Sequence, residues 1–239
     1  CSLDFIADKP EDMLGKVDAV MVTARNGRFH PEFARPFIEA GIPAFIDKPF
    51  ANCGDEAVKL AKLAKSKGVP LVGGSSTKLV YDVLQLAYAR RNAFDAVGAG
   101  SVAAPVSMDN PYGGFYFYSS HLAEISMTIF GYNPKSVAAY RAGDNITAIA
   151  RYDSFDVTNH FVEGNYTYSA AIYGKGKTVA RDIDISMCYQ HECAIFVDML
   201  RTGRMSHSYE HLVWPVIYLN AIKKAYEEGV EVALEFPEI

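Results

Sequence analysis

The first third of the chain alternates short apolar runs with longer amphipathic ones. The short runs are rich in β-branched residues and are typical of strands covered on both faces. The longer runs repeat apolar residues at helical spacing and end at glycine. The order strand–helix–strand–helix–strand predicts parallel strands joined by right-handed crossovers. The predicted strands are residues 17–23, 44–46 and 69–73. The predicted helices are residues 31–40 and a helix that Asn52 or Asp55 caps at its start and that Gly68 ends.

The pattern changes after Gly98, where strand-like runs follow one another with short turns between them. The turns contain Gly, Asn and Asp, which favour tight hairpins. Four such runs predict an antiparallel meander. These four strands are residues 136–141, 147–152, 156–163 and 166–173. The predicted helices are residues 79–91, 189–202 and 209–228, and a strand-like run, residues 230–234, follows the last of them. We therefore expect an α/β domain, residues 1–76, followed by an α+β domain, residues 77–239, with an open, mostly antiparallel sheet.

Composition excludes several classes of function. The chain has 239 residues, half of them hydrophobic, so it can bury a sizeable core. Its net charge of −5 argues against non-specific binding to nucleic acid. No apolar run is long enough to cross a membrane. The four cysteines have no paired spacing, which favours free thiols and a cytoplasmic location.

The most informative stretch is Gly41–Phe50, in which a predicted strand runs directly into Asp47-Lys48-Pro49. Proline has no N–H to donate, so it ends the strand, and it holds Lys48 in an extended conformation. The lysine ammonium is then placed at the carboxyl end of a parallel strand. In open α/β sheets this edge is where ligands bind. A lysine that only solvates a loop is the alternative interpretation.

The order of these signals resembles the Gfo/Idh/MocA family of NAD(P)-dependent oxidoreductases over nearly the whole chain. In that family a Thr and a His flank the turn after one strand, the next strand ends in Asp-Lys-Pro or Glu-Lys-Pro, and a Val-Gly strand end follows. A glycine-rich turn and a histidine-bearing helix come later, in an antiparallel α+β domain. The matching residues here are Thr23 with His30, Asp47-Lys48-Pro49, Leu71-Val72-Gly73, Gly113-Gly114, His121–Glu124 and Ile129-Phe130-Gly131.

The resemblance implies that residues 1–76 are the C-terminal half of a Rossmann-like dinucleotide-binding domain. It also implies hydride transfer between NAD or NADP and a sugar, cyclitol or related polyol, with Lys48 and His121 as the catalytic residues. Lys48 would hold a substrate hydroxyl and help to move its proton, and His121 would act as acid and base. The residues expected at the cofactor are Thr23, Asn26, His30, Asp47, Lys48 and Pro49, and those expected at the substrate are Lys78, Tyr112, Tyr116, Tyr118 and Glu124.

Two departures from the family pattern matter. The first strand and the Gly-x-Gly-x-x-Gly turn that cradles the pyrophosphate would lie before Cys1, so we expect weak or no cofactor binding by the 239 residues. The family often has Asp four residues before the histidine, whereas this chain has Phe117. Glu124 lies one helical turn after His121 and would orient it instead. A non-catalytic relative, or a fragment that folds and oligomerises without binding a dinucleotide, is the alternative function.

Each candidate residue also has a structural interpretation. His121 would be a hydrogen-bonded core histidine, the tyrosines a core stripe, and the residues after the first strand ordinary caps and turns. Gly98–Ala103 fits Gly-x-Gly-x-x-Ala, but no strand precedes it and Pro105 stops a following helix, so we discard it. Gly174–Lys177 is predicted to be a hairpin turn rather than a phosphate loop. The histidines and cysteines lack zinc-ligand spacing, so no metal site is expected. The aromatic residues of the second domain predict a homodimer or homotetramer formed through its sheet.

Overall fold

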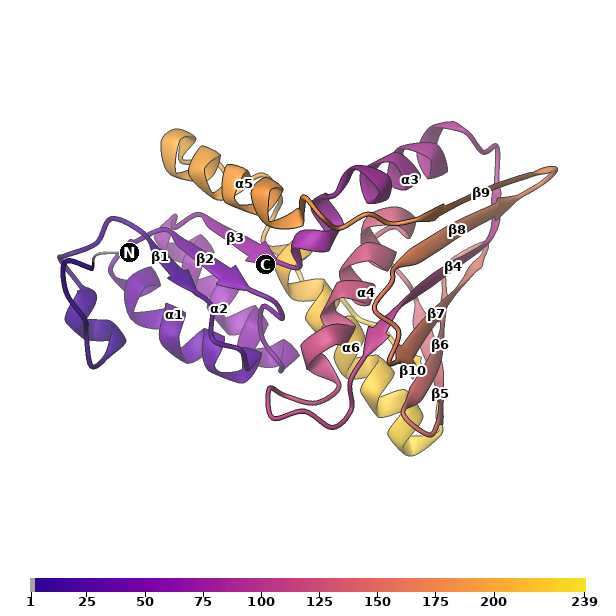
Figure 1. The fold of residues 1–239 in the computed structure, drawn as a ribbon, viewed down its shortest axis with the longest axis horizontal. Coiled ribbons are helices and arrows are strands. Elements are labelled where there is room, and N and C mark those ends of the chain that lie inside the picture. Colours follow the sequence, from indigo (N-terminus) through magenta and orange to yellow (C-terminus); the bar gives the residue numbers. More distant parts are fainter. Residues whose placement is uncertain (1–2) are drawn as a thin grey trace.

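The structure, a computed structural model, describes residues 3–239 and contains two sheets (Figure 1). The smaller sheet has three parallel strands in the order β1-β2-β3. These strands are Val20–Val22, Ala44–Asp47 and Leu71–Gly74. The helices that connect them, α1 (His30–Glu39) and α2 (Gly54–Lys67), lie on one face of this sheet. The predicted order of strands and helices is therefore confirmed, although the first strand is shorter than predicted.

Successive residues of β2 face opposite layers of the small sheet. Ile46 packs in the hydrophobic cluster formed with α1 and α2. Its neighbour Phe45 packs instead against Val72 and against Phe196 of α5 (Cys188–Thr202), with the two phenyl centroids 5.8 Å apart. Because side chains alternate along a strand, α5 covers the face opposite α1 and α2. The small sheet is thus covered on both faces, as its apolar strand sequences predict.

The start of α2 depends on a residue from the other end of the chain. The residue at its N-cap position makes no side-chain capping bond. The Gly54 N–H donates instead to Asn220 Oδ1, 2.8 Å away, on helix α6 (Glu210–Glu228). The prediction that Asn52 or Asp55 caps this helix is therefore wrong, because the cap comes from a distant helix. The predicted glycine at the C-terminal end is present in the left-handed conformation.

The larger sheet has seven strands in the order β10-β5-β6-β7-β4-β8-β9. Strands β5, β6 and β7 form an antiparallel meander, as predicted. Strand β4 lies between β7 and β8 and runs parallel to β7, so the predicted meander is wrong in its last step. The strands are β4 (Val97–Val106), β5 (Ser136–Ala142), β6 (Asn145–Arg151), β7 (Asp156–Glu163), β8 (Ser169–Gly174), β9 (Lys177–Asp182) and β10 (Val232–Ala233).

Strand β4 has a composition that conceals it from sequence analysis, since it contains Gly98, Gly100 and Pro105. Gly100 has a packing reason: a Cβ there would come within 2.3 Å of the ring of Phe130, on α4 (Tyr116–Phe130). The discarded glycine motif therefore lies inside a strand and opens no helix. The turn between β8 and β9 is the predicted hairpin, with Gly174 paired to Lys177.

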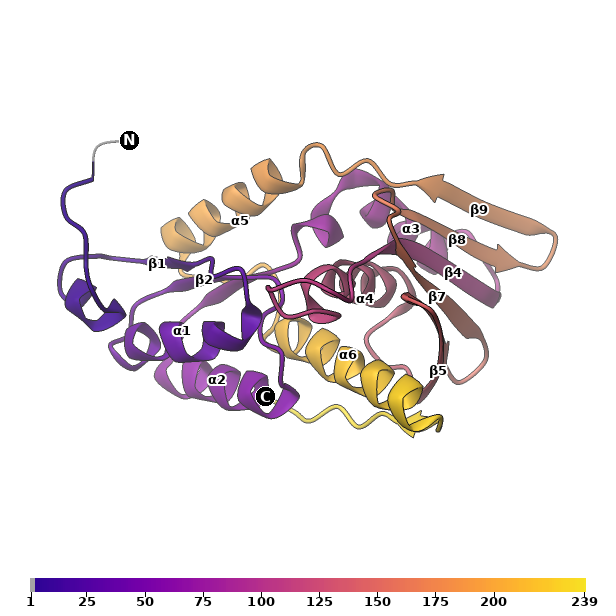
Figure 2. The same cartoon turned by 60° about the horizontal axis from the view of Figure 1, so that its bottom comes forward.

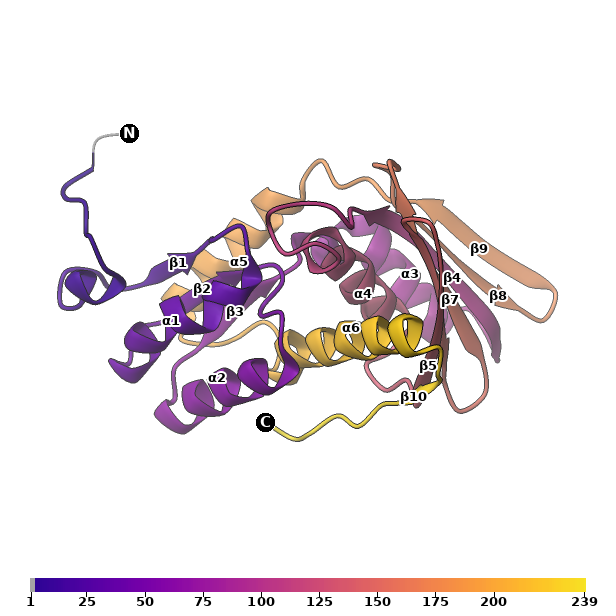
Figure 3. The same ribbon diagram turned by 90° about the horizontal axis from the view of Figure 1, so that it is seen from below.

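Helices α3 (Tyr81–Asn92), α4 and α6 cover one face of the larger sheet, and no helix of residues 3–239 covers the other (Figures 2 and 3). The phenylalanines Phe130 and Phe161 are fully buried on the covered side. On the strands of this sheet, Tyr140 and Tyr173 are exposed aromatic residues. The aromatic residues that suggested a subunit interface are thus divided between the core and exposed positions.

Helix α6 joins the two sheets (Figure 3). Leu212 and Val216, near its start, belong to the same hydrophobic cluster as α1 and α2. Tyr218 and Ile222, further along, belong to the core of the larger sheet. The end of the chain returns beside it, and Ile239 is buried in the cluster of the small sheet. Burying a side chain of this size contributes about 1.5–3 kcal/mol, so α6 holds the sheets together with several such contacts.

Three short 3-10 helices, Pro10–Met13, Gly27–Phe29 and Ser76–Leu79, complete the described elements. Over residues 3–239, no helix is long and apolar enough to cross a bilayer. In the same range, no group of three or more His, Cys, Asp or Glu side chains is arranged to hold a metal ion. Cys53, Cys188 and Cys193 are free thiols, and Cys1 lies outside the described residues.

Candidate functional site

A cleft of about 460 Å³ opens where the carboxyl ends of β1 and β2 meet the start of α4. Ligands of open α/β sheets bind at this edge, so the cleft is the candidate site. Its lining combines residues from the strand ends with residues from the segment that leads into α4. The lining residues are Thr23, Arg25, Asp47, Lys48, Tyr112, Phe117 and Tyr118.

Lys48 reaches across the cleft from the end of β2 to the first turn of α4. Its Nζ donates a hydrogen bond to the Phe117 carbonyl, 3.0 Å away. The same ammonium lies 3.8 Å from the centroid of the Phe117 ring, a cation–π contact. An ammonium has three N–H donors, and this carbonyl takes one of them. The site therefore holds Lys48 in place and leaves donors for a ligand.

The electrostatics of the cleft favour a less basic Lys48. Partial burial lowers the pKa of its ammonium, the Asp47 carboxylate opposes this, and the Arg25 guanidinium lowers it further. Asp47 Oδ1 accepts a hydrogen bond from the backbone N–H of Lys48, 2.7 Å away. Within residues 3–239, no carboxylate forms an ion pair with the Lys48 ammonium. A lysine in this state exchanges a proton more readily than a free one.

His121 lies on α4, one helical turn after Phe117. Its Nδ1 is 2.7 Å from Ser75 Oγ, at the end of β3. Burial lowers the pKa of the imidazole to about 3, and the nearby Lys48 charge lowers it as well. The ring is therefore neutral at physiological pH. The structure thus brings the two predicted catalytic residues to the same side of α4, with the ring of Tyr118 near both.

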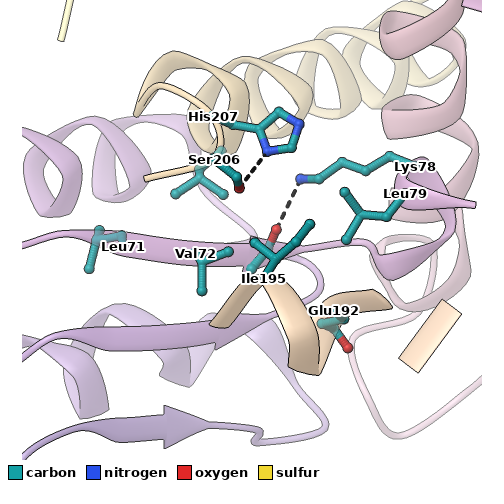
Figure 4. A pocket seen from close by; sticks show the side chains of 10 residues that line it. Leu71, Val72, Lys78, Leu79, Glu192, Ile195, Ser206 and His207 are labelled. Carbon is teal, nitrogen blue, oxygen red and sulfur yellow. Dashed lines mark hydrogen bonds between the residues drawn. The ribbon is translucent and has the colours of Figure 1, made fainter. Parts of the chain in front are cut away.

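Lys78 does not face the cleft, contrary to expectation. Its ammonium is 3% exposed, forms an ion pair of 2.6 Å with Glu124 on α4, and donates to the Gly73 carbonyl at 2.9 Å (Figure 4). The space around it, beside Glu192 and His207, holds only about 10 Å³, far too little for a sugar. Lys78 is therefore a buried cation that links β3 to α4.

Glu124 also differs from its prediction, in which it contacts and orients His121. Its carboxylate accepts from Lys78 and from the backbone N–H of Ser75, the latter at 2.6 Å, so it does not bond to His121. The i, i+3 spacing on α4 places Glu124 and His121 near each other, but Lys78 provides a stronger partner for the carboxylate. Ser75 is the residue that contacts His121.

The residues after β1 hold the loops of the site together. Both ring nitrogens of the buried His30 face backbone carbonyls, Pro49 O at 2.8 Å and Ala24 O at 2.7 Å. Asn26 Oδ1 accepts from the Arg28 N–H at 3.1 Å and caps the short helix that follows. These contacts fix the β1 turn against the Lys48 turn, and the expected cofactor contacts of His30, Asn26 and Pro49 stay predictions.

The three candidate tyrosines do not all lie at the cleft. Tyr112 and Tyr118 line the cleft, and the Arg25 guanidinium lies 4.8 Å from the Tyr112 ring centroid. Tyr116 turns away, because its hydroxyl accepts from Asn220 Nδ2 at 3.1 Å on α6. Tyr116 therefore packs between α4 and α6, apart from the residues that line the cleft, and its substrate contact gains no support from this position.

Sequence analysis missed Arg25 and Ser75. Arg25 stands two residues after Thr23, at a strand end, and that position was the available signal. Ser75 follows the glycine pair Gly73-Gly74, but nothing in the local sequence indicates that its hydroxyl meets a histidine 46 residues further along the chain.

A dinucleotide would find part of its site among the described residues. Thr23 lines the cleft and also an adjoining hollow of about 520 Å³ along the free edge of β1. In residues 3–239, no Gly-x-Gly-x-x-Gly turn follows a strand and opens a helix, so these residues offer no cradle for the pyrophosphate.

The first part of the chain defines the class of protein. Residues 2–75 match the model of an oxidoreductase family with an NAD-binding Rossmann fold, GFO_IDH_MocA. This match confirms the predicted resemblance to the Gfo/Idh/MocA family over residues 2–75. No curated protein matches the chain by sequence.

Solved structures extend the likeness of the fold to nearly the whole chain. A probable dehydrogenase from Thermotoga maritima aligns with TM-score 0.83 and 16% identity, over 95% of this chain and 84% of that one. Myo-inositol 2-dehydrogenase from Lactobacillus plantarum aligns with TM-score 0.83 and 14% identity, over 96% and 84%. The WlbA dehydrogenase from Bordetella pertussis, in complex with NADH and UDP-GlcNAcA, aligns with TM-score 0.74 and 17% identity, over 95% and 82%. The predicted fold class, a partial Rossmann-like sheet followed by an open, mostly antiparallel sheet, is confirmed.

Proposed function

We propose that the protein is an oxidoreductase that transfers a hydride between NAD or NADP and a sugar, cyclitol or related polyol. The observation that carries this proposal is the position of Lys48, at the carboxyl end of β2 in a cleft with free donors and no paired carboxylate among residues 3–239. The NAD-binding family whose model matches residues 2–75 supports the cofactor. Related folds named as an inositol dehydrogenase and as a complex with NADH and a nucleotide sugar support the substrate class.

The cleft suits a polyhydroxylated substrate. The rings of Tyr112 and Tyr118 offer apolar faces for a sugar ring together with O–H groups. The hydroxyl that is to be oxidised donates to the neutral amine of Lys48, and Thr23 lies at the cofactor side of the same cleft. These contacts would hold the reacting carbon toward β1.

The proposed reaction divides the two hydrogens of a secondary alcohol. The nicotinamide, when bound, accepts the hydride from carbon. The hydroxyl proton passes to the neutral amine of Lys48, and the C–O bond becomes a carbonyl. The lowered pKa of Lys48 makes its neutral form more accessible near physiological pH. In the reverse direction the ammonium returns the proton to the alkoxide oxygen.

We further propose that the protein is a homodimer or homotetramer that uses the open face of the larger sheet. That face is uncovered by any helix of residues 3–239 and exposes Tyr140 and Tyr173. Static light scattering should give a mass of at least twice that of one chain at micromolar concentration. A monomer under those conditions would contradict this part of the proposal.

The test of function is an assay of a protein that contains residues 1–239 against a panel of sugars and cyclitols with NAD⁺ and NADP⁺. We expect absorbance of the reduced nicotinamide to appear for at least one combination of substrate and cofactor. Lys48→Ala should then lose about 10²-fold or more in kcat/KM. His121→Ala should also lower turnover. Lys62→Ala, on the exposed face of α2, removes the same charge away from the cleft and should leave turnover unchanged.

Two results would contradict the proposal. Unchanged turnover in both Lys48→Ala and His121→Ala would show that the roles are wrong. NADH binding is measured by the change in NADH fluorescence. If the protein neither turns over a substrate nor binds NADH, the alternative is favoured, a non-catalytic relative that binds no dinucleotide.

A further inference from the structure

The Ser75 hydroxyl lies where three hydrogen-bonding groups converge. Its Oγ is 3.2 Å from the Thr77 N–H, 2.6 Å from Thr77 Oγ1 and 2.7 Å from His121 Nδ1. Ser75 is completely buried and Thr77 is 2% exposed, so solvent does not supply alternative partners. The positions of the protons in this cluster can therefore be deduced by counting donors and acceptors.

The neutral His121 ring permits two arrangements. In the first, Nδ1–H donates to Ser75, Ser75 donates to Thr77, and the Thr77 hydroxyl proton has no acceptor among residues 3–239. In the second, Thr77 donates to Ser75, Ser75 donates to an unprotonated Nδ1, and every hydroxyl proton is used. Ser75 Oγ then accepts twice, from the N–H and the O–H of Thr77, and donates once. The second arrangement is favoured, because a buried hydroxyl proton without an acceptor is unfavourable.

We infer that Ser75 and Thr77 hold His121 as the Nε2–H tautomer, so that His121 is a hydrogen-bond donor to the substrate and Lys48 alone takes up and releases the proton. The tautomer follows from the cluster itself, whereas the division of roles rests on the proposed function. Ser75 and Thr77 are positioning residues in this scheme, since they act through His121.

The Nε2 atom is available for this role. Within residues 3–239 it has no hydrogen-bond partner, and His121 is only partly buried. The titratable or charged groups near His121 are Lys48 at the end of β2, Tyr118 on α4 and Tyr168 before β8. The Glu124 carboxylate, one helical turn along α4, is paired with Lys78 and does not bond to His121, which agrees with a ring that stays neutral.

The surrounding framework prevents Ser75 from changing its hydrogen bonds. The Ser75 backbone N–H donates to Glu124 Oε1, 2.6 Å away, and Lys78 Nζ donates to Glu124 Oε2, also 2.6 Å away. Lys78 also binds the Gly73 carbonyl, two residues before Ser75. The Lys78–Glu124 ion pair therefore fixes the backbone that carries the Ser75 side chain. It affects the cleft indirectly, because Ser75 contacts His121.

The tautomer can be measured directly by ¹⁵N–¹H correlation NMR of the imidazole nitrogens in histidine-labelled protein. At neutral pH we expect His121 to show an unprotonated Nδ1 and a protonated Nε2. Ser75→Ala removes the donor to Nδ1 and should shift the ring toward a mixture of tautomers. A protonated Nδ1 in the wild-type protein would overturn the inference, whatever the enzymatic activity.

The division of roles is tested by replacing His121 with two residues of different hydrogen-bonding capacity. Glutamine has an Nε2 donor and no basic group, so His121→Gln should keep at least ten times the kcat of His121→Ala. The rise of kcat with pH should persist in His121→Gln and disappear in Lys48→Met.

Equal losses in His121→Gln and His121→Ala, with the pH dependence abolished in both, would show that His121 is the base and would overturn this division. Unchanged turnover in Lys48→Met would instead refute the proposed function, and the NMR result would stand apart from it.

Discussion

Two lysines follow neighbouring strands of the small sheet, and their surroundings differ in every respect that matters for chemistry. Lys48, after β2, contacts a phenyl ring and a backbone carbonyl, and burial lowers its pKa. Lys78, after β3, is paired with Glu124. Burial alone would lower its pKa, but the Glu124 carboxylate outweighs it and raises the pKa, so Lys78 stays charged. One lysine is suited to exchange a proton and the other to hold two elements together.

The difference arises from α4 rather than from the strands. Both lysines are carried by the same sheet edge, where parallel strands present their following residues to ligands. Helix α4 presents Phe117 to the first and Glu124 to the second, two helical turns apart. A cation at a strand end is therefore a candidate for chemistry only if the facing element leaves its charge without a carboxylate.

The largest effect should come from Lys78→Met. Removal of one partner of a buried ion pair leaves Glu124 uncompensated and should lower the free energy of unfolding by about 3–5 kcal/mol. Urea denaturation measures this, with Lys62→Met as an exposed control that stays within about 0.5 kcal/mol. Lys78→Met/Glu124→Met should recover part of the loss, because no charge is then left buried. Equal stability of the single and double variants would contradict the ion pair's assigned role.

The second effect concerns Lys48, whose replacement should lower turnover rather than stability. Lys48→Met should lower kcat/KM by about 10²-fold while changing the free energy of unfolding by no more than about 1 kcal/mol. Turnover and urea denaturation on the same preparation separate the two quantities. If Lys48→Met were destabilised as strongly as Lys78→Met, the contrast between the two lysines would be lost.

A third effect concerns Glu192, which lies beside Lys78 (Figure 4). Burial raises its pKa to about 8, and the Asp47 charge adds to this, whereas Lys78 opposes it. The ordinary pKa of a glutamate is 4.5, so above pH 4.5 the unfolded state releases the proton that the folded state still holds. The stability of the folded state is therefore lost progressively as the pH rises toward 8. Glu192→Gln should be more stable than wild type at pH 9 and about equal to it near pH 4.

Thermal or urea unfolding at the two pH values measures the effect, and Glu228→Gln, on the exposed end of α6, provides the control. Other titrating groups, His121 among them, act equally on both proteins and cancel in the difference. The same stability difference at both pH values would show that Glu192 is ionised in the folded protein.

The smallest effect should come from making Lys48 resemble Lys78. Phe117→Asp places a carboxylate near the Lys48 ammonium and should raise the pKa of the lysine, because a nearby negative charge stabilises the ammonium. The pH dependence of kcat, or ¹⁵N NMR of the Lys48 side chain, reports this shift. Phe117→Leu removes the ring without adding charge and should not raise the pKa. An unchanged pKa in Phe117→Asp would mean that the facing residue does not set the state of Lys48.

Local patterns predicted the elements of the small sheet and the position of Lys48 because those features depend on neighbours within a few residues. The same patterns failed for β4, whose glycines are explained by the Phe130 ring that packs on them. They also failed for the cap of α2, which Asn220 supplies from 166 residues away. Lys78 and Glu124 were recognised as notable residues, but their mutual contact was not, so both were assigned to the substrate.

The sequence by itself determined the alternation of strands and helices, the proline that ends β2, and the presence of Lys48 and His121 in a family pattern. Only the tertiary structure decided which lysine is paired, which hydroxyl meets the imidazole, and which tyrosines reach the cleft. These contacts join residues separated by 46 to 69 positions, and a hydrogen bond of 2.6–3.0 Å between such residues exists only after packing has brought their elements together. Local propensity acts before that packing and therefore contains no information about the partner.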